Sequence, residues 1–247
     1  MGTGFVFQIA DDKPEDQLRQ HCESAMEILD DADARFSLYK PESELSKLVR
    51  GELSWQLASG HQKSIADDCD FWKEKTRGYF DARAGSDYDP SGLVKTWAAR
   101  NAANYLSANG VEQFTLNAGG DVYLSENLED PLLNRVGLSN LNPLASRQGG
   151  VNMVLDLAGT QFRAVATSGT AERGEHIWRV AQEREFIQVS VISKDLVQAD
   201  IWATAIISGG EAAWELFLQE ADMVAVATFP DGSIVGSKGF TDLLAKL

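Results

Sequence analysis

Two side chains with hard oxygen atoms, Asp200 and Thr204, interrupt the apolar run Leu196–Gly210 at a separation of four residues. On a helix, residues at this separation lie on the same face. A buried carboxylate is costly unless it is paired with a cation, hydrogen-bonded or bound to a metal. The two oxygens could coordinate Mg²⁺, which prefers oxygen ligands. Alternatively, Asp200 caps a helix and Thr204 bonds back to its own turn.

The segment Asp89–Lys95, with the sequence DPSGLVK, has the composition of a helix start. Asp89 or Ser91 is the candidate N-cap residue. Lys95 falls in or near the first turn, where the helix dipole opposes a cation. An anion bound at the free N–H groups of this terminus would explain the lysine. The alternative is a capped helix without a ligand.

Two further segments combine small residues with polar ones. Gly119, Gly120 and Asp121 lie between two expected strands, which predicts either a tight hairpin or a close backbone approach to a ligand. Ala164–Trp178 places hydroxyl-bearing residues after a strand, and such a loop can surround a phosphate or a sugar, or be a plain polar turn. It also contains His176, but no G-x-S-x-G pattern of a hydrolase accompanies it.

The elements that must position these residues follow from hydrophobic periodicity. We expect a strand at Phe5–Ala10, then helices from Pro14 onward, over His61–Thr76 and after Asp89–Gly92. Short strands follow at 113–117, 121–125, 135–139, 151–157, 161–166 and 186–193. The helix with Asp200 comes next, then another at Glu211–Gln219 and two strands that flank Pro230–Gly232. This order predicts one α+β domain over residues 1–247, with mixed strands and packed helices.

Composition limits the function. The chain has 247 residues and a formal net charge of −15, which argues against nucleic acid or an anionic membrane as the primary partner. No segment reaches the length of a membrane span, and no signal peptide is visible, so we expect a cytoplasmic protein without membrane insertion unless a leader was removed. Cys22 and Cys69 fall at apolar helical positions, and we expect both to be core thiols.

Taken together, the motifs give a resemblance to a known family. The chain resembles the FAD:protein FMN transferases, the ApbE-like family, in a compact form with a short segment between Phe80 and Asp89. The matching motifs occur in order along the whole chain: MGT at Met1–Thr3, RFSLYKPESELSKL at Arg35–Leu48, FD at Phe80–Asp81, DPSGLVK at Asp89–Lys95, NAGGD at Asn117–Asp121, ATSGT at Ala166–Thr170, HI at His176–Ile177 and ADIWAT at Ala199–Thr204.

The resemblance implies a fold related to the T-fold and the activity of a flavin transferase. Members of the family bind FAD and Mg²⁺ and move the FMN moiety of FAD onto a threonine of an acceptor flavoprotein, releasing AMP. By motif, the implied metal ligands are Asp200, Thr204 and the carbonyl groups of Gly92 and Ala203. The implied contacts to the flavin nucleotide are Met1, Tyr39, Tyr79, Phe80, Asp81, Asp89, Lys95 and Ile177. The residues implied to shape the same cleft are Asn117, Gly119, Gly120, Asp121, Thr167, Ser168 and Gly169.

For catalysis, Asp200 and His176 are the candidates, with His176 as the general base for the attacking hydroxyl. The sequence departs from the family pattern at Thr96, where glycine is usual, and at Trp178–Arg179, where Asp-Pro is usual. Three alternatives therefore stay open. The chain could hydrolyse FAD to FMN and AMP, could bind flavin without turnover, or could be an interaction domain that binds no nucleotide.

Overall fold

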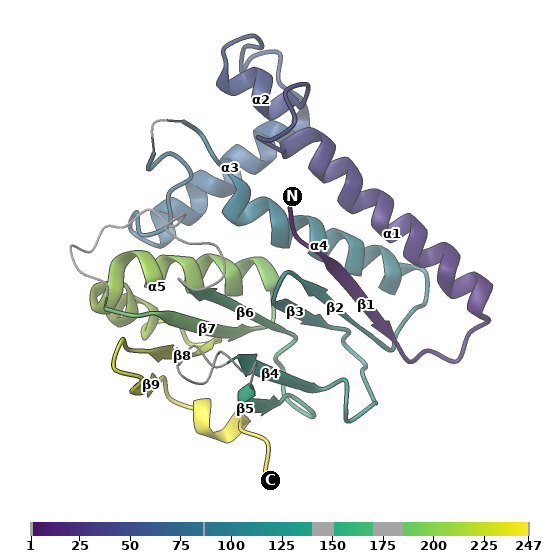
Figure 1. Cartoon of the computed structure of the whole chain (residues 1–247), viewed down its shortest axis with the longest axis vertical. Coiled ribbons are helices and arrows are strands. Elements are labelled where there is room, and N and C mark those ends of the chain that lie inside the picture. Colours follow the sequence, from purple (N-terminus) through teal and green to yellow (C-terminus); the bar gives the residue numbers. More distant parts are fainter. Residues whose placement is uncertain (1, 86, 140–150, 170–184, 247) are drawn as a thin grey trace.

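The computed structural model describes residues 2–85, 87–139, 151–169 and 185–246, and it is an α+β fold (Figure 1). The helices are α1 (Glu15–Phe36), α2 (Glu44–Val49), α3 (Gly60–Lys75), α4 (Ser91–Ala108), α5 (Leu196–Phe217) and the 3₁₀ helix η2 (Phe240–Leu243). The strands are β1 (Phe5–Ile9), β2 (Phe114–Ala118), β3 (Asp121–Leu124), β4 (Arg135–Ser139), β5 (Val151–Asp156), β6 (Ala164–Gly169), β7 (Gln188–Ser193), β8 (Val224–Thr228) and β9 (Ile234–Gly236). The expected α+β class is confirmed.

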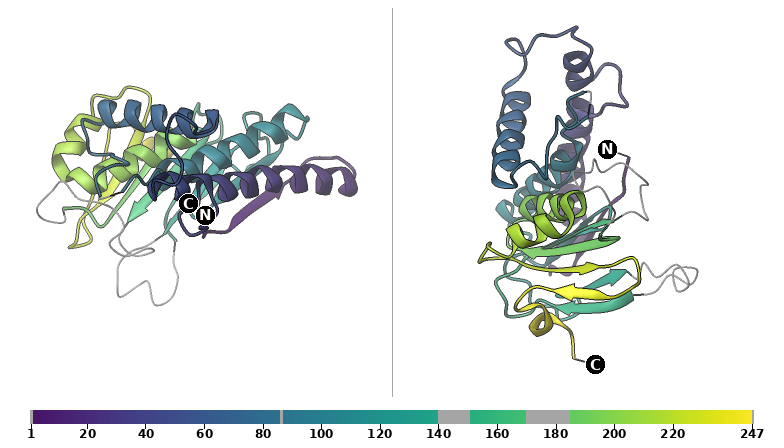
Figure 2. Two further views of the ribbon diagram at one scale, coloured as in Figure 1. Left: turned by 90° about the horizontal axis from the view of Figure 1, so that it is seen from above. Right: turned by 90° about the vertical axis from the view of Figure 1, so that its left-hand side faces the viewer.

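One seven-stranded sheet organises the molecule. Its strand order is β1-β2-β3-β6-β7-β8-β9, and each of its pairings is antiparallel. Helices α4 and α5 pack on one face, and α1 lies against α4 (Figures 1 and 2). The β4–β5 hairpin and η2 cover part of the other face. Because side chains alternate along a strand, β3, β6, β7 and β8 each contribute residues to the cores on both faces of the sheet.

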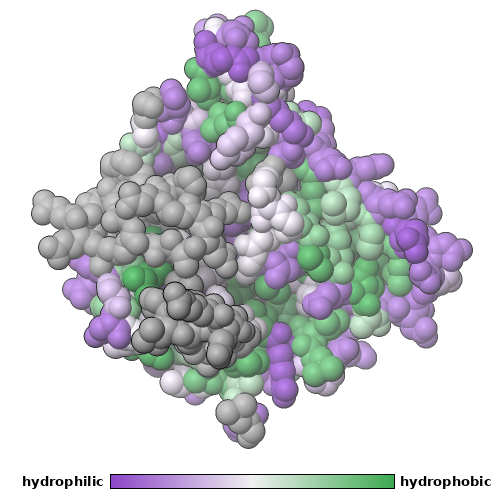
Figure 3. Space-filling view, in the orientation of Figure 1, coloured by the Kyte–Doolittle hydropathy of each residue, from purple (hydrophilic) through white to green (hydrophobic). Residues whose placement is uncertain are grey.

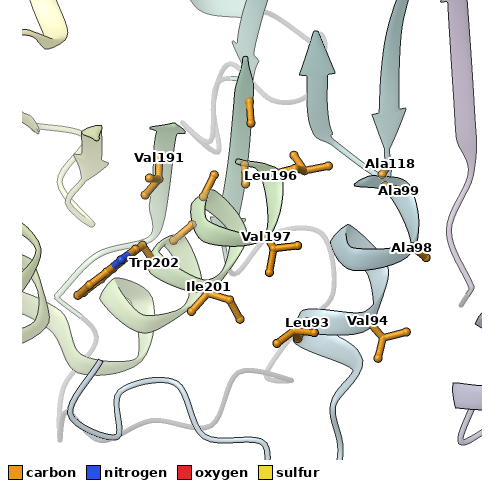
Figure 4. Close-up of a cluster of buried hydrophobic side chains, with 14 of the residues drawn as sticks. Leu93, Val94, Ala98, Ala99, Ala118, Val191, Leu196, Val197, Ile201 and Trp202 are labelled. Atoms are coloured by element: carbon orange, nitrogen blue, oxygen red, sulfur yellow. The ribbon is translucent and has the colours of Figure 1, made fainter. Parts of the chain in front are cut away.

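The larger core lies between the sheet and the helices. Figure 4 shows Leu93 of α4 on the side that faces Val197 and Ile201 of α5, close to the start of α4. Trp202 is fully buried on α5 and is among the largest side chains of this core. These apolar contacts hold α4 and α5 side by side, which fixes the polar residues that the two helices carry between them.

A kink divides α5 at Gly210. The sequence predicts a separate helix from Glu211, directly after this kink. Gly210 has φ 59° and ψ −142°, a conformation that glycine adopts far more readily than other residues. The carboxylate of Glu185 accepts a hydrogen bond from the backbone N–H of Glu211 and so caps the second half of the helix. A side chain at Gly210 would collide with this carboxylate.

The tight hairpin between β2 and β3 is confirmed. Gly119 and Gly120 have φ of 63° and 101°, and Ala118 pairs with Asp121 across the two-residue turn. The N-terminal segment lies against this turn, because Gly119 N donates to Gly4 O at 3.0 Å. A Cβ at Gly119 would also collide with the hydroxyl of Thr3.

Several sequence expectations are wrong in detail. The strand expected at 161–166 begins at Ala164 and continues to Gly169, so Thr167 and Ser168 belong to a strand rather than a loop. Neither α2 nor η2 was expected. Cys69 is buried, but Cys22 is only half-buried, because its turn of α1 is not completely covered.

Within the described ranges, none of the helices combines the length and apolar character needed to cross a membrane.

Candidate functional site

Three charged side chains from three elements meet between the sheet and the helices. Lys95 of α4 places its Nζ 2.5 Å from Asp121 Oδ2 on β3 and 3.5 Å from Asp200 Oδ2 on α5. The two carboxylate side chains are 1% and 5% exposed, and that of Lys95 is 16% exposed. Burial strengthens each of these interactions, because little water screens them.

The backbone of the hairpin and of β6 determines where Asp121 points. Asp121 directly follows the Gly119–Gly120 turn, and its side chain lies on the helix side of the sheet with Tyr123 of the same strand. Its Oδ1 accepts a hydrogen bond from Thr167 N at 2.9 Å. One carboxylate thus connects β6 to Lys95, and its two oxygens have different partners.

Hydroxyl groups surround Asp200 and Thr204. Thr96 Oγ1 donates to Asp200 Oδ2 at 3.1 Å. Thr204 Oγ1 and Ser168 Oγ are also 3.1 Å apart, and either atom can be the donor. Asp200 and Thr204 therefore lie on one face of α5, as their spacing predicts, and this face meets α4 and β6.

The cluster has more negative than positive charge. Burial raises the pKa of Asp200 to about 6; the Lys95 ammonium opposes this effect, and the Asp121 carboxylate adds to it. Two carboxylates face one ammonium, so one negative charge is not balanced within the cluster. A cation supplied from outside would balance it.

The donor chemistry fits Mg²⁺, which takes oxygen ligands and keeps waters or substrate phosphates in its remaining positions. Asp200 offers a carboxylate and Thr204 a hydroxyl. Among the residues that the structure describes, no group of three or more His, Cys, Asp or Glu could hold a metal. An ion here would therefore also need carbonyl groups, water or phosphate oxygens.

The start of α4 is built differently from the expectation. The helix begins at Ser91, and Pro90 takes the N-cap position without a side-chain bond. Asp89 Oδ1 instead accepts from Ser91 N at 2.9 Å, just outside the helix. The Phe80 ring lies 3.3 Å from where a Cβ of Gly92 would be, so glycine allows this close packing. Within the protein, the anions that accompany Lys95 are the carboxylates of Asp121 and Asp200.

The Tyr79–Asp81 stretch lies against the same two helices. The Tyr79 ring occupies the space that a side chain at Gly209 of α5 would fill, and Phe80 is buried. Asp81 forms an ion pair with Lys73 at 2.8 Å and is therefore already engaged. Ala203, an implied metal ligand through its carbonyl, is fully buried on α5.

Two further implied site residues that the structure describes are Tyr39 and Gly169. Tyr39 lies in the turn between α1 and α2 and is 88% exposed. Gly169 ends β6. Met1, His176 and Ile177 lie outside the described residues, as do Trp178 and Arg179.

Asn117 and Thr167 point to the opposite face of the sheet. Leu116 and Ala118 enter the core under the helices, so alternation turns Asn117 away from it. Asn117 and Thr167 line an open pocket of about 330 Å³ together with residues of β1, β3 and β4. Figure 3 shows hydrophobic surface on the right side of this view, near β1 and β2. The NAGGD motif therefore contributes to both faces.

Sequence reasoning missed two contacts of the site, the Lys95–Asp121 ion pair and the Ser168–Thr204 contact. It noted Thr96 only as a departure from a pattern. The available signal was the alternation of β3, which assigns Asp121 and Tyr123 to one face.

The comparison with protein families identifies the chain. A sequence profile of the ApbE family matches residues 82–228, more than half of the chain's 247 residues. The chain therefore belongs to the ApbE family. This stretch includes Lys95, Asp121, Asp200 and Thr204. No curated protein matches the sequence.

Solved structures share the fold over nearly the whole chain. The flavin transferase ApbE from Vibrio cholerae has a TM-score of 0.75 and 17% identity, covering 99% of this chain and 96% of that one. The ApbE protein from Thermotoga maritima has a TM-score of 0.78 and 18% identity, covering 99% of this chain and 97% of that one. The apo form of the Pseudomonas stutzeri flavinyl transferase ApbE has a TM-score of 0.74 and 16% identity, covering 100% of this chain and 95% of that one. These likenesses establish the shared fold.

Proposed function

We propose that this protein is a flavin transferase that moves the FMN moiety of FAD onto a threonine of an acceptor flavoprotein, with Mg²⁺ bound and AMP released. The observation that carries the proposal is the buried Lys95–Asp121–Asp200 cluster next to Thr204, in a chain of the ApbE family. We also propose that residues 1–247 act as one domain. The fold shared with the named flavin transferases supports the activity.

Transfer of a phosphoryl-linked group needs positioning and charge neutralisation more than covalent chemistry by the enzyme. Lys95 would bind oxygens of the FAD diphosphate, and Asp121 would hold its ammonium in place. Asp200 and Thr204 would hold Mg²⁺ with the carbonyl groups of Gly92 and Ala203. When bound, the ion would neutralise the negative charge of the diphosphate oxygens.

The reaction needs no nucleophile from this chain. The acceptor threonine hydroxyl attacks the FMN-side phosphorus, the bond to the bridging oxygen breaks, and AMP leaves with that oxygen. The hydroxyl proton goes to a general base, for which His176 is the proposed group.

The remaining implied residues would bind the rest of FAD. Met1, Tyr39, Tyr79, Phe80, Asp81, Asp89 and Ile177 are the proposed contacts to the flavin nucleotide. Asn117, Gly119, Gly120, Thr167, Ser168 and Gly169 would shape the cleft. The ion pair of Asp81 with Lys73 must open, or Asp81 must bind the nucleotide through its backbone.

The test is to incubate the protein with FAD, Mg²⁺ and a flavoprotein domain that carries a target threonine. We expect covalent flavin on the acceptor, seen by in-gel fluorescence, and an equal amount of AMP. The acceptor with that threonine replaced by valine is the matched control and should stay unlabelled, and EDTA should stop the reaction.

Each other outcome identifies an alternative. Free FMN and AMP without labelled acceptor would mean an FAD pyrophosphatase, in which water is the nucleophile. Thermal stabilisation by FAD without AMP release would mean a flavin-binding protein without turnover. No effect of FAD on stability would leave an interaction domain and overturn the proposal.

A further inference from the structure

Thr96 is a buried threonine in the first half of α4, next in sequence to Lys95. Its side chain is fully buried, and its Oγ1 lies 3.1 Å from Asp200 Oδ2 and 3.3 Å from the carbonyl of Leu93. It therefore connects α4 to α5 at the carboxylate that the proposed function assigns to the metal.

The hydroxyl has one proton, so only one of the two acceptors can receive it fully. A hydrogen bond to a carboxylate is stronger than one to a neutral carbonyl, and the Asp200 distance is also the shorter. Leu93 O lies only three residues back on the same helix, where a threonine hydroxyl makes a weak local contact. We therefore assign the hydrogen bond of the Thr96 hydroxyl to the Asp200 carboxylate, with Thr96 as the donor.

The same carboxylate oxygen also faces Lys95 Nζ at 3.5 Å. Consecutive residues of one helix thus place an ammonium and a hydroxyl on Asp200 Oδ2. Two donors on one oxygen hold the plane of the carboxylate, which a single flexible lysine would not do.

We propose that Thr96 is a positioning residue that orients the Asp200 carboxylate for a divalent cation. The inference rests on the proposed function and adds to it a residue outside the ligand set. Hydrogen-bonded partners of a metal ligand fix its orientation, and their loss typically weakens metal affinity 10–100-fold. Glycine at this position would supply no donor, so this chain orients its carboxylate by a contact of its own.

The experiment measures Mn²⁺ affinity from the free-ion EPR signal, in the absence of FAD, for the wild type and four variants. Thr96→Val keeps the shape and loses the donor, and Thr96→Ser keeps the donor. Thr115→Val is the matched control, a buried threonine on the opposite sheet face whose Oγ1 bonds to Gln8. Asp200→Asn reports whether the measured ion is the one at this site.

We expect Thr96→Val to weaken Mn²⁺ binding by about tenfold or more. Thr96→Ser and Thr115→Val should bind like the wild type, and Asp200→Asn should lose the site. If Thr96→Val fails to fold, as judged by circular dichroism and thermal unfolding, Thr96→Ala tests the same loss of the donor.

Unchanged affinity in Thr96→Val, or equal weakening in Thr96→Ser, would overturn the inference, and so would a wild type that binds no Mn²⁺. Covalent labelling of the acceptor by the wild type with FAD and Mg²⁺ separates this result from the proposed function. A Thr96 effect on Mn²⁺ affinity without labelled acceptor would leave the positioning role and contradict the transferase. Labelled acceptor without a Thr96 effect on Mn²⁺ affinity would leave the transferase and overturn the positioning role.

Discussion

Asp200 shows what burial does to a single residue. Its side chain is 5% exposed, and its neighbours are one ammonium, one hydroxyl and a second carboxylate. Desolvation is the largest of the effects on its pKa, ahead of the opposing attraction of Lys95. The ionised form of Asp200 is therefore less stable in the folded protein than its hydrogen bond and ion pair alone would suggest.

Without metal, Asp200 should make stability depend on pH. Its pKa rises from 3.8 to about 6 on folding, so the folded state holds a proton more tightly than the unfolded state. The stability from this proton is fully present below pH 4 and is lost as pH rises through 6. We expect the wild type to lose about 3 kcal/mol relative to Asp200→Asn over this window.

The measurement is urea unfolding of both proteins between pH 4 and 7 in EDTA. Asp200→Asn preserves the side-chain shape and cannot ionise, so the difference between the two curves isolates this group. Parallel curves would show that Asp200 is not desolvated as described.

At the scale of single elements, α5 combines a polar face with a break. The half before Gly210 carries Asp200 and Thr204 to the cluster, and the half after it packs Trp214 and Phe217 into the core. The kink lets α5 carry the polar residues in its first half and the aromatic core residues in its second, and Glu185 accepts a hydrogen bond from Glu211 N at the break.

Gly210→Ala should destabilise the protein, because its φ of 59° and ψ of −142° strain any residue with a Cβ. We expect a loss of about 2 kcal/mol, with more if the Glu185 carboxylate cannot move away. Thermal unfolding measures it. Gly60→Ala is the control, since Gly60 begins α3 with open space around it, and it should be neutral or slightly stabilising. Equal stability of the two variants would contradict the strain.

The two cysteines report how well α1 and α3 are covered. Burial raises the pKa of the Cys69 thiol to about 12, and it raises the pKa of the half-buried Cys22 as well. Only the thiolate reacts with iodoacetamide. We expect peptide mapping at pH 8 to show Cys22 modified first and Cys69 modified only in urea. Comparable rates for both in the folded protein would mean that α3 opens readily.

At the scale of the whole molecule, the proposed site draws on elements from both halves of the chain. Lys95 and Thr96 come from α4, whereas Asp200 and Thr204 come from α5, with Thr96 and Asp200 separated by 104 residues. A ligand that binds across these elements binds only the folded state and should stabilise it.

FAD with Mg²⁺ should therefore raise the unfolding temperature. At a ligand concentration 100 times the Kd, the folded state gains about 2.7 kcal/mol. For a chain of this size, each kcal/mol raises Tm by about 2–4 °C, so we expect a shift of roughly 5–10 °C. AMP alone should give a smaller shift. No shift with FAD at saturating concentration would contradict nucleotide binding.

The sequence by itself determined the elements and much of their local chemistry. Alternation marked the strands, helical spacing placed Asp200 and Thr204 on one face, and the Gly119–Gly120 pair predicted the hairpin. These features depend on residues close together in the chain, so their pattern is visible without the fold. The strand at Ala164–Gly169 was misplaced by three residues, because the serine and threonine there suggested a loop.

Only the tertiary structure decided which residues meet. Periodicity tells which side of an element faces the core, but not which distant element lies opposite. The strand order β1-β2-β3-β6 and the packing of α4 on α5 bring Asp121 close to Lys95 and Asp200. Lys95 therefore has two carboxylates as its partners. Asp121 of β3 pairs with Ala118 of β2, and both face the helices. Asn117 precedes Ala118 on β2 and faces away from the helices, because neighbouring positions of a strand alternate between the two faces of the sheet.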